Sequence, residues 1–239
     1  MIPASLWSLL NILLSPDILE RVLEETRSSL IPGTNKFDIA TLCAKPLLTS
    51  IYLEALRYSV AVAVARNPSG GAVNLNNWII TPGTTVLSIS WFGAHDSSFW
   101  NAGPGDSHPV NSFWPERFLQ YPNDPSSGPI KNREKTTSVN DTKQPEEPTR
   151  TATDCKAAKA TTAGTEGHFY PYGGGVKMCP GRFFAKQEML ASIAVMLQQF
   201  EIELTDIEAA RKVEPDTRYF PVGAMPPKSK VPIRIRRRQ

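Results

Sequence analysis

The sequence predicts a mainly α-helical fold with a small β portion, an α+β arrangement, and three observations support this class. Residues 2–14, 16–30, 46–60 and 182–200 place apolar side chains at helical spacing. Residues 72–75 and 78–90 read instead as strands around a turn. Between about 121 and 167, large apolar side chains almost disappear. The 239 residues, 41% of them hydrophobic, suffice for one substantial core with a polar segment attached.

The first apolar run is too short for a membrane helix. Residues 2–14 fall below the roughly 20 residues that a membrane-spanning helix needs, and no basic leader of a signal peptide precedes them. We expect a buried helix that ends near Ser15-Pro16. Ser15 can cap a second helix that starts at Pro16, with Ile18 and Val22 on its apolar face and Glu20 and Arg21 on its polar face.

The next elements are a loop, a helix and a hairpin. Pro32-Gly33 predicts a loop over residues 31–37, and Pro46 opens the helical stretch 46–60. For residues 72–75 and 78–90, we expect a small hairpin whose turn lies at Pro82-Gly83, because proline suits the first central turn position and glycine the second.

The polar segment 121–167 is predicted to be a disordered insertion. It is rich in Pro, Ser, Thr, Lys and Glu, and its Cys155 is interpreted as an incidental exposed thiol. A helix follows from about Arg182 to Phe200. The last forty residues contain several prolines among short apolar runs, which favours edge strands and turns over helices.

Composition excludes several classes of function. A net charge of +3 with dispersed basic residues does not indicate a nucleic-acid partner. Cys43, Cys155 and Cys179 are far apart, odd in number and without a CxxC pair, so neither a disulfide framework nor a zinc site is indicated. A reducing compartment fits this cysteine usage best.

The segment PYGGGVKMCPGRFFA is the most informative stretch of the chain. It places Cys179 after a glycine-rich backbone and directly before a helix. Glycines let a backbone come close to a flat ligand, and a helix N-terminus favours a thiolate. A lone cysteine in such a place is more often only a small buried side chain.

The residues around this cysteine resemble the haem-binding loop of the cytochrome P450 family. The matching residues, in order, are Tyr172, Gly173, Gly175, Lys177, Cys179, Gly181 and Ala185. The resemblance implies a haem b cofactor with Cys179 as the axial iron ligand, the chain's metal site. Tyr172 stands where the family usually has Phe, and Lys177 where it has Arg or His. Tyr172 keeps a ring on the thiolate side, and Lys177 keeps a cation for a haem propionate.

Two further motifs resemble the same family. The stretch LEALR matches its Glu-any-any-Arg motif and FWPERF its partner motif, which implies a structural triad of Glu54, Arg57 and Arg117 that braces the core. Arg66, at the end of an apolar run, is expected to bind a haem propionate. Alone, Glu54 and Arg57 would be an ordinary helix-surface pair, and Arg66 a solvated arginine at a strand end. His95 is interpreted as structural, while His108 and His168 lie in loops without a functional signal.

The resemblance covers residues 1–120 and 168–239 and only the C-terminal half of the family's fold, so we expect residues 1–239 to be the haem-binding part of a P450 domain truncated at its N-terminus. It leans toward the branch with sterol 7-hydroxylases and prostacyclin synthase.

The implied function is a monooxygenase that inserts one oxygen atom from O2 into a lipophilic substrate, with an NADPH-dependent reductase as partner. For the full-length family member we expect the cytosolic face of the endoplasmic reticulum membrane; this chain shows no anchor. Two alternatives stay open: a haem-thiolate isomerase or dehydratase acting on a peroxide, and a non-catalytic truncated product.

Overall fold

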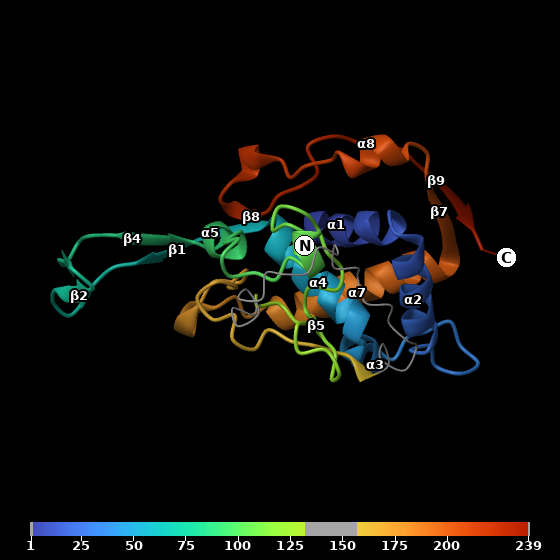
Figure 1. Ribbon diagram of the computed structural model, residues 1–239, viewed down its shortest axis with the longest axis horizontal. Helices are drawn as coiled ribbons and strands as arrows, with labels where there is room; N and C mark the ends of the chain where they lie inside the picture. The colour runs from blue at the N-terminus through green and yellow to red at the C-terminus, as the bar shows by residue number, and fades with distance from the viewer. Residues whose placement is uncertain (1, 132–156, 239) are drawn as a thin grey trace, which may run out of the picture.

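The computed structural model describes residues 2–131 and 157–238, in which helices form the body of the molecule and strands lie at its edges (Figure 1). The helices are α1 (Ile2–Leu13), α2 (Pro16–Arg27), α3 (Ile39–Ala44), α4 (Pro46–Ser59), α5 (Ser90–Ala94), α7 (Arg182–Gln199) and α8 (Ile207–Arg211), with 3-10 turns η1 (Pro104–Asp106), η3 (Gly175–Lys177) and η4 (Thr217–Tyr219). The strands are β1 (Val60–Arg66), β2 (Val73–Leu75), β3 (Trp78–Ile80), β4 (Val86–Ile89), β5 (Leu119–Gln120), β6 (Lys159–Ala160), β7 (Phe200–Leu204), β8 (Val222–Ala224) and β9 (Ile233–Arg237). The predicted α+β class is confirmed.

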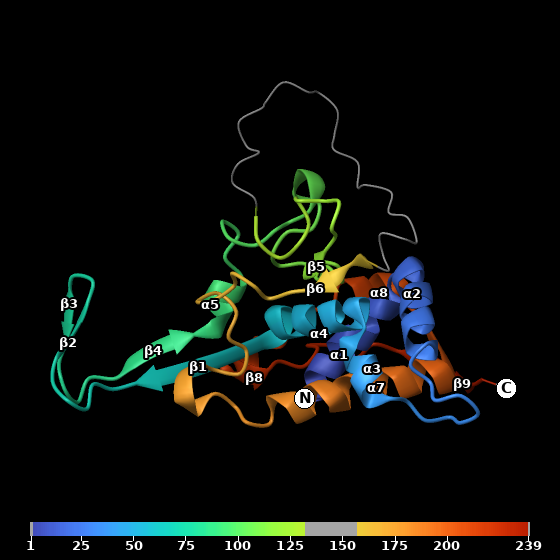
Figure 2. The same cartoon turned by 90° about the horizontal axis from the view of Figure 1, so that it is seen from below.

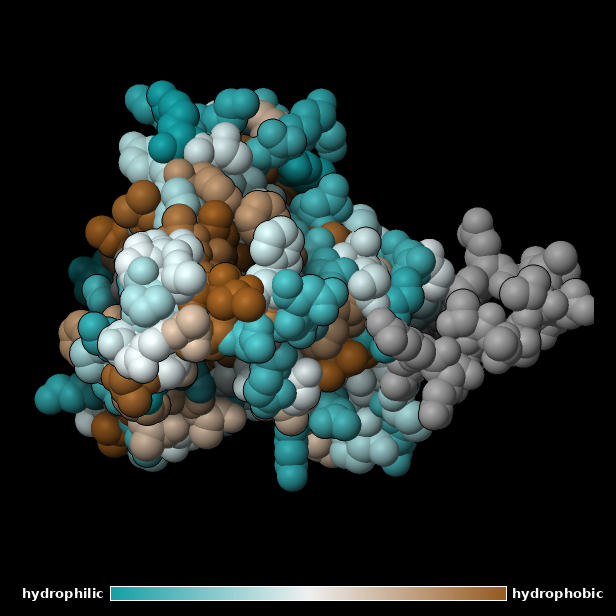
Figure 3. All heavy atoms as spheres, turned by 90° about the vertical axis from the view of Figure 1, so that its left-hand side faces the viewer, coloured by the Kyte–Doolittle hydropathy of each residue, from teal (hydrophilic) through white to brown (hydrophobic). Residues whose placement is uncertain are grey.

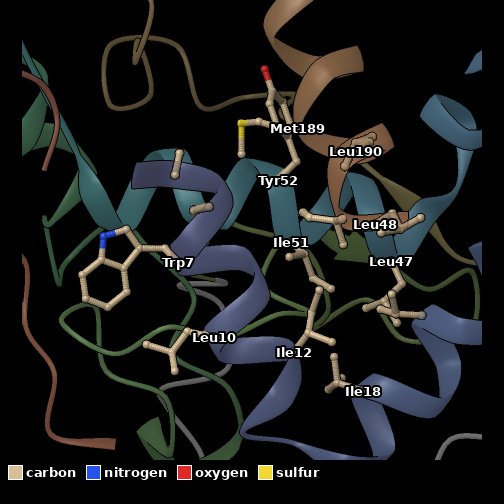
Figure 4. Packing of buried hydrophobic residues seen from close by; sticks show 14 of the residues in the cluster. Trp7, Leu10, Ile12, Ile18, Leu47, Leu48, Ile51, Tyr52, Met189 and Leu190 are labelled. Atoms are coloured by element: carbon tan, nitrogen blue, oxygen red, sulfur yellow. The ribbon is translucent and has the colours of Figure 1, made fainter. Parts of the chain in front are cut away.

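The core lies where α1, α2, α4 and α7 meet. Figure 4 shows side chains from all four helices converging, and the fully buried ones include Ile12, Leu48, Ile51, Met189 and Leu190. Burial of each such side chain stabilises the fold by about 1.5–3 kcal/mol. Among the described residues, no single helix is long and apolar enough to cross a membrane; α1 and α2 meet such a criterion only jointly, with a bend of 115° between them.

The helix starts at Pro16 and Pro46 are confirmed, but the predicted cap is wrong. Ser15 occupies the capping position of α2 with an extended backbone, yet its side chain makes no capping hydrogen bond. The start of α4 is capped from a distance instead. Glu25 of α2 accepts hydrogen bonds from the backbone N–H groups of Leu47 and Leu48 at 3.0 and 2.9 Å. A carboxylate at a helix N-terminus satisfies unpaired donors and interacts favourably with the helix dipole.

The predicted hairpin exists, but its turn lies elsewhere. Strands β2 and β3 pair through a turn at Asn76-Asn77, where Asn76 has a φ of 53°. Pro82-Gly83 forms a second turn that leads to β4, which pairs antiparallel with β1 and not with the hairpin. Asparagine tolerates a positive φ in a two-residue turn, so Asn76-Asn77 was the sequence signal for this turn. The prediction gave more weight to Pro82-Gly83. β1 is the central strand of a sheet ordered β4-β1-β8, and the hairpin projects beyond it (Figure 2).

The C-terminal forty residues are mostly strands and turns, with one exception. β7 and β9 pair antiparallel over five residues, and β8 joins β1. The expectation of no helix is wrong at α8 (Ile207–Arg211), because the Asp206 carboxylate accepts the Ala209 N–H at 2.9 Å and caps one helical turn. A hydrogen bond of 2.9 Å from Trp7 Nε1 to the Met225 carbonyl ties this segment to α1.

Both flanks of the predicted insertion are structured. Tyr121 is buried, and Asn101 Nδ2 donates to the carbonyls of Ser126 and Gly128 at 2.9 and 2.8 Å. On the other flank, β6 pairs with β5. Disorder is therefore the wrong prediction for residues 121–131 and 157–167. Their turns, rich in Ser, Pro and Gly, are stabilised by hydrogen bonds, and Tyr121 and Ala158 are buried in the core. The remainder, residues 132–156 with Cys155, lies outside the described residues.

Candidate functional site

The glycine-rich loop before α7 is folded back on itself. The Cys179 N–H donates to the Tyr172 carbonyl at 3.0 Å, which closes the loop around η3. Gly173 and Gly175 have φ values of 76° and 68°. Side chains other than glycine rarely adopt this left-handed backbone, so the loop needs glycine at both positions. The loop thus presents Cys179 at its end, directly before the helix.

Three elements anchor this loop through side chains. Arg66, at the end of β1, donates from Nη2 to the Gly174 carbonyl at 2.6 Å. On β4, the Ser88 hydroxyl lies 2.8 Å from the Tyr170 hydroxyl. On α4, the Tyr52 hydroxyl lies 2.9 Å from the Tyr172 hydroxyl. The loop therefore has a position defined by the sheet and by the central helix.

Cys179 carries an exposed free thiol at the start of α7. A Cβ at Gly181 would lie 3.8 Å from Cys179 Sγ, an ordinary van der Waals contact. Large apolar side chains around the cysteine are also exposed: Val176, Met178, Phe183 and Phe184. Figure 3 faces the end from which the hairpin projects, and hydrophobic atoms gather there among polar ones.

One exposed thiol among exposed apolar side chains fits a flat apolar ligand with a metal at its centre. Exposed apolar patches of this kind mark places where a ligand or partner covers the surface, and a thiol in the patch supplies one soft ligand. In the described part of the chain, no group of three or more His, Cys, Asp or Glu side chains could hold a bare metal ion. The chemistry available here is that of a single thiolate ligand.

Arg66 and Lys177 were the cations predicted for this site. Lys177 belongs to the loop itself, and Arg66 contacts the loop through a hydrogen bond. Arg66 is exposed, and besides the Gly174 carbonyl it donates to the Ala65 carbonyl at 2.8 Å. Lys177 is exposed at the end of η3, two residues before Cys179. Both side chains are exposed to solvent, and their binding to haem propionates stays a prediction.

Glu54, Arg57 and Arg117 meet in a buried cluster. The Glu54 carboxylate accepts two hydrogen bonds from Arg57, at 2.7 Å from Nε and 2.8 Å from Nη2. Arg117 Nε donates to the same carboxylate at 3.1 Å, as does the Trp114 backbone N–H at 3.0 Å. All three charged side chains have an exposed fraction of 0%. An isolated charge could not be buried in this way.

The remaining donors of the two arginines bind backbone carbonyls. Arg57 donates to Ala94, Val110 and Ser112, while Arg117 donates to Asn101, His108, Pro109 and Ser112. Burial alone would raise the pKa of Glu54, but the guanidinium groups, Arg117 first and then Arg57, outweigh it and hold this pKa below its ordinary value. The cluster links α4 to the loops between α5 and β5.

Each of the three histidines stacks on an aromatic ring. His95 stacks on Trp91 with ring centroids 3.7 Å apart, and burial, helped by Arg57, lowers its pKa to about 4. His108 stacks on Trp114 and His168 on Phe99.

Sequence reasoning missed Tyr52 as a contact of the cysteine loop. Its side chain is 5% exposed and carries a hydroxyl that meets Tyr172. The available signal was a tyrosine on the buried face of a helix, because a buried phenol needs a hydrogen-bond partner. Sequence spacing could not identify a partner that lies 120 residues away.

A family model and several known proteins match the sequence of this chain. A family model described as Cytochrome P450 matches residues 1–231. Cytochrome P450 monooxygenase efuG of Hormonema carpetanum is 36% identical over 100% of this chain and 41% of the relative. Cytochrome P450 monooxygenase fsoE of Humicola fuscoatra is 35% identical over 100% of this chain and 40% of the relative.

A more distant relative carries a sterol-related name. The 7-alpha-hydroxycholest-4-en-3-one 12-alpha-hydroxylase of Oryctolagus cuniculus is 27% identical over 98% of this chain and 42% of the relative. The chain spans about two fifths of the length of the curated relatives it matches.

Proposed function

Because the chain belongs to the cytochrome P450 family, we propose that it is the haem-binding part of a haem-thiolate monooxygenase, with Cys179 as the axial ligand of the iron. The observation that carries this proposal is the exposed Cys179 thiol at the end of a glycine turn, surrounded by exposed apolar side chains. The family implies haem, and haem b is the proposed type. When bound, it supplies the activation of O2 and the insertion of one oxygen atom into the substrate.

The chain's own residues hold and shield this group. Cys179, which lies three residues before α7, would hold the iron through its sulfur. Phe183 and Phe184 on the first turn of α7, both exposed apolar side chains, would cover apolar ring surface. Arg66 and Lys177 would bind the propionates, and the Tyr172 ring would lie on the same side of the group as Cys179. Glu54, Arg57 and Arg117 brace α4, against whose Tyr52 the cysteine loop rests.

The substrate proposed for the whole protein is a lipophilic small molecule, with a sterol or a related secondary metabolite as the leading class. The names of the fungal monooxygenases and of the sterol hydroxylase favour oxygen insertion over peroxide isomerisation or dehydration. Electrons would come from an NADPH-dependent reductase. For the whole protein we propose the cytosolic face of the endoplasmic reticulum membrane.

A carbon monoxide difference spectrum tests the ligand. The purified chain is mixed with haem and reduced, and we expect the red-shifted band typical of thiolate-ligated ferrous haem. Cys179→Ala abolishes this band, whereas Cys43→Ala, the matched control at the other described cysteine, leaves it intact. A band that survives Cys179→Ala refutes the assigned ligand. Failure of the unsubstituted chain to bind haem supports the non-catalytic truncated product for this chain.

A further inference from the structure

We propose that the hydroxyl groups of Tyr52 and Tyr172 act as a pair that positions Cys179 and thereby sets the reduction potential of the haem it binds. The effect on the reduction potential rests on the proposed function, because it requires bound haem. The positioning of Cys179 by the two tyrosines concerns the chain alone. Both tyrosines are positioning residues, because their hydroxyl contacts reach the proposed iron ligand through the loop backbone.

The pair joins the cysteine to the core by two consecutive hydrogen bonds. The hydroxyl oxygens of Tyr52 and Tyr172 lie 2.9 Å apart, and the Tyr172 carbonyl accepts the Cys179 N–H at 3.0 Å. Tyr52 is 5% exposed and belongs to the apolar core cluster. In Figure 4 its hydroxyl points away from the other labelled core residues. A displacement of either ring therefore displaces the backbone that holds Cys179.

The helix that carries Tyr52 is itself fixed. Glu54, two residues further along α4, accepts hydrogen bonds from Arg57 and Arg117 in the buried cluster. The start of the same helix is capped by Glu25. Tyr52 thus lies on a helix that is held at its start by Glu25 and further along by the buried cluster, and it transmits that position to the loop.

The loop needs such an anchor because of its glycines. Gly173, Gly174 and Gly175 are consecutive, and glycine loses more conformational freedom on folding than any other residue. The other two side-chain anchors, Ser88 to Tyr170 and Arg66 to Gly174, are exposed, so water competes with them. The tyrosine pair is the part-buried anchor of the three.

The hydroxyl of Tyr172 also explains a departure from the resembled loop, in which this position is usually Phe. Phenylalanine here would leave the buried Tyr52 hydroxyl without the contact it now makes, and an unsatisfied buried hydroxyl is costly. The two tyrosines are therefore expected to act as one unit. Removing either hydroxyl breaks the same contact as removing both, so the position of the loop should change alike in the single and the double variants.

Four variants of the 239-residue chain test the pair: Tyr52→Phe, Tyr172→Phe, the double variant and Tyr58→Phe. Tyr58→Phe is the matched control, since it removes the hydroxyl of a tyrosine on the same helix whose ring packs against Trp7 and Phe113. The first readout is hydrogen exchange of the Cys179 amide in the haem-free chain. We expect exchange about fivefold faster in each of the first three variants, the size expected for one net hydrogen bond, and unchanged in the control.

The second readout is the midpoint reduction potential of the haem-loaded chain. We expect Tyr52→Phe and Tyr172→Phe to shift it in the same direction and by the same amount, with no additional shift in the double variant. Additive shifts, an unshifted potential, or unchanged Cys179 exchange overturns the positioning role. A chain that binds no haem refutes the electrochemical proposal together with the proposed function, whereas the exchange measurement still decides whether the pair holds the loop.

Discussion

Glu54→Gln is the perturbation with the largest effect that the structure predicts away from the cysteine. The substitution keeps the size of the side chain but removes the negative charge that Arg57 and Arg117 share. It also places an amide donor where the carboxylate accepts four hydrogen bonds from three residues. Two guanidinium groups then stay buried at 0% exposure without an anion.

The magnitude follows from the burial of the pair. Removing one partner of a buried ion pair costs about 3–5 kcal/mol, compared with a total stability of about 5–15 kcal/mol for an ordinary domain. With a urea dependence of about 3 kcal/mol per molar, the unfolding midpoint should fall by roughly 1–2 M. A domain whose stability lies at the lower end of this range would then be close to unfolded without urea.

Urea titration followed by tryptophan fluorescence measures this effect. Trp100 and Trp114 are local reporters, since their rings lie 5.8 Å and 5.4 Å from the guanidinium carbons of Arg57 and Arg117. Glu203→Gln is the matched control, because Glu203 is exposed and its pairing with Arg234 contributes little. If Glu54→Gln lowers the midpoint no more than this control does, the reasoning about the buried cluster is refuted.

Three further outcomes are expected. Ile51→Ala should destabilise the fold by about 2–5 kcal/mol because Ile51 is fully buried where the helices meet, and a small urea shift would contradict that packing. The His95 pKa is lowered from 6.5 to about 4, so the unfolded chain binds the proton more tightly; stability should fall by roughly 3 kcal/mol as pH drops from 6.5 to 4, and His95→Gln should remove this dependence in urea titrations across that range. Arg66→Gln should weaken haem binding severalfold in a spectroscopic titration, while equal affinity would remove Arg66 from the proposed propionate contacts.

Local signals in the sequence predicted the helices better than the strand pairing. The helices at Pro16, Pro46 and Arg182 were identified from apolar spacing, and the first two also from proline at the first turn; both signals act within a few residues. The hairpin turn was misplaced, because Pro82-Gly83 is indeed a turn but connects two strands that pair with different partners. Pairing partners are chosen by packing, which sequence spacing does not encode.

The flanks of the polar insertion show the same limit. Tyr121 is buried beside turns that lack large apolar side chains, so composition alone indicated disorder. The turns are ordered by Asn101, which lies more than twenty residues earlier and binds two of their carbonyls. Such long-range hydrogen bonds become visible only in the folded chain.

The sequence by itself determined the α+β class, the family resemblance and the cysteine loop, because glycine, proline and helix spacing constrain the backbone locally. It also identified Glu54, Arg57 and Arg117 through their resemblance to family motifs. Only the tertiary structure decided that these three side chains share one buried carboxylate and that Tyr52 meets Tyr172. The physical reason is that charges and hydroxyl groups become costly when buried, and their partners are whichever groups the packed helices bring within hydrogen-bond distance.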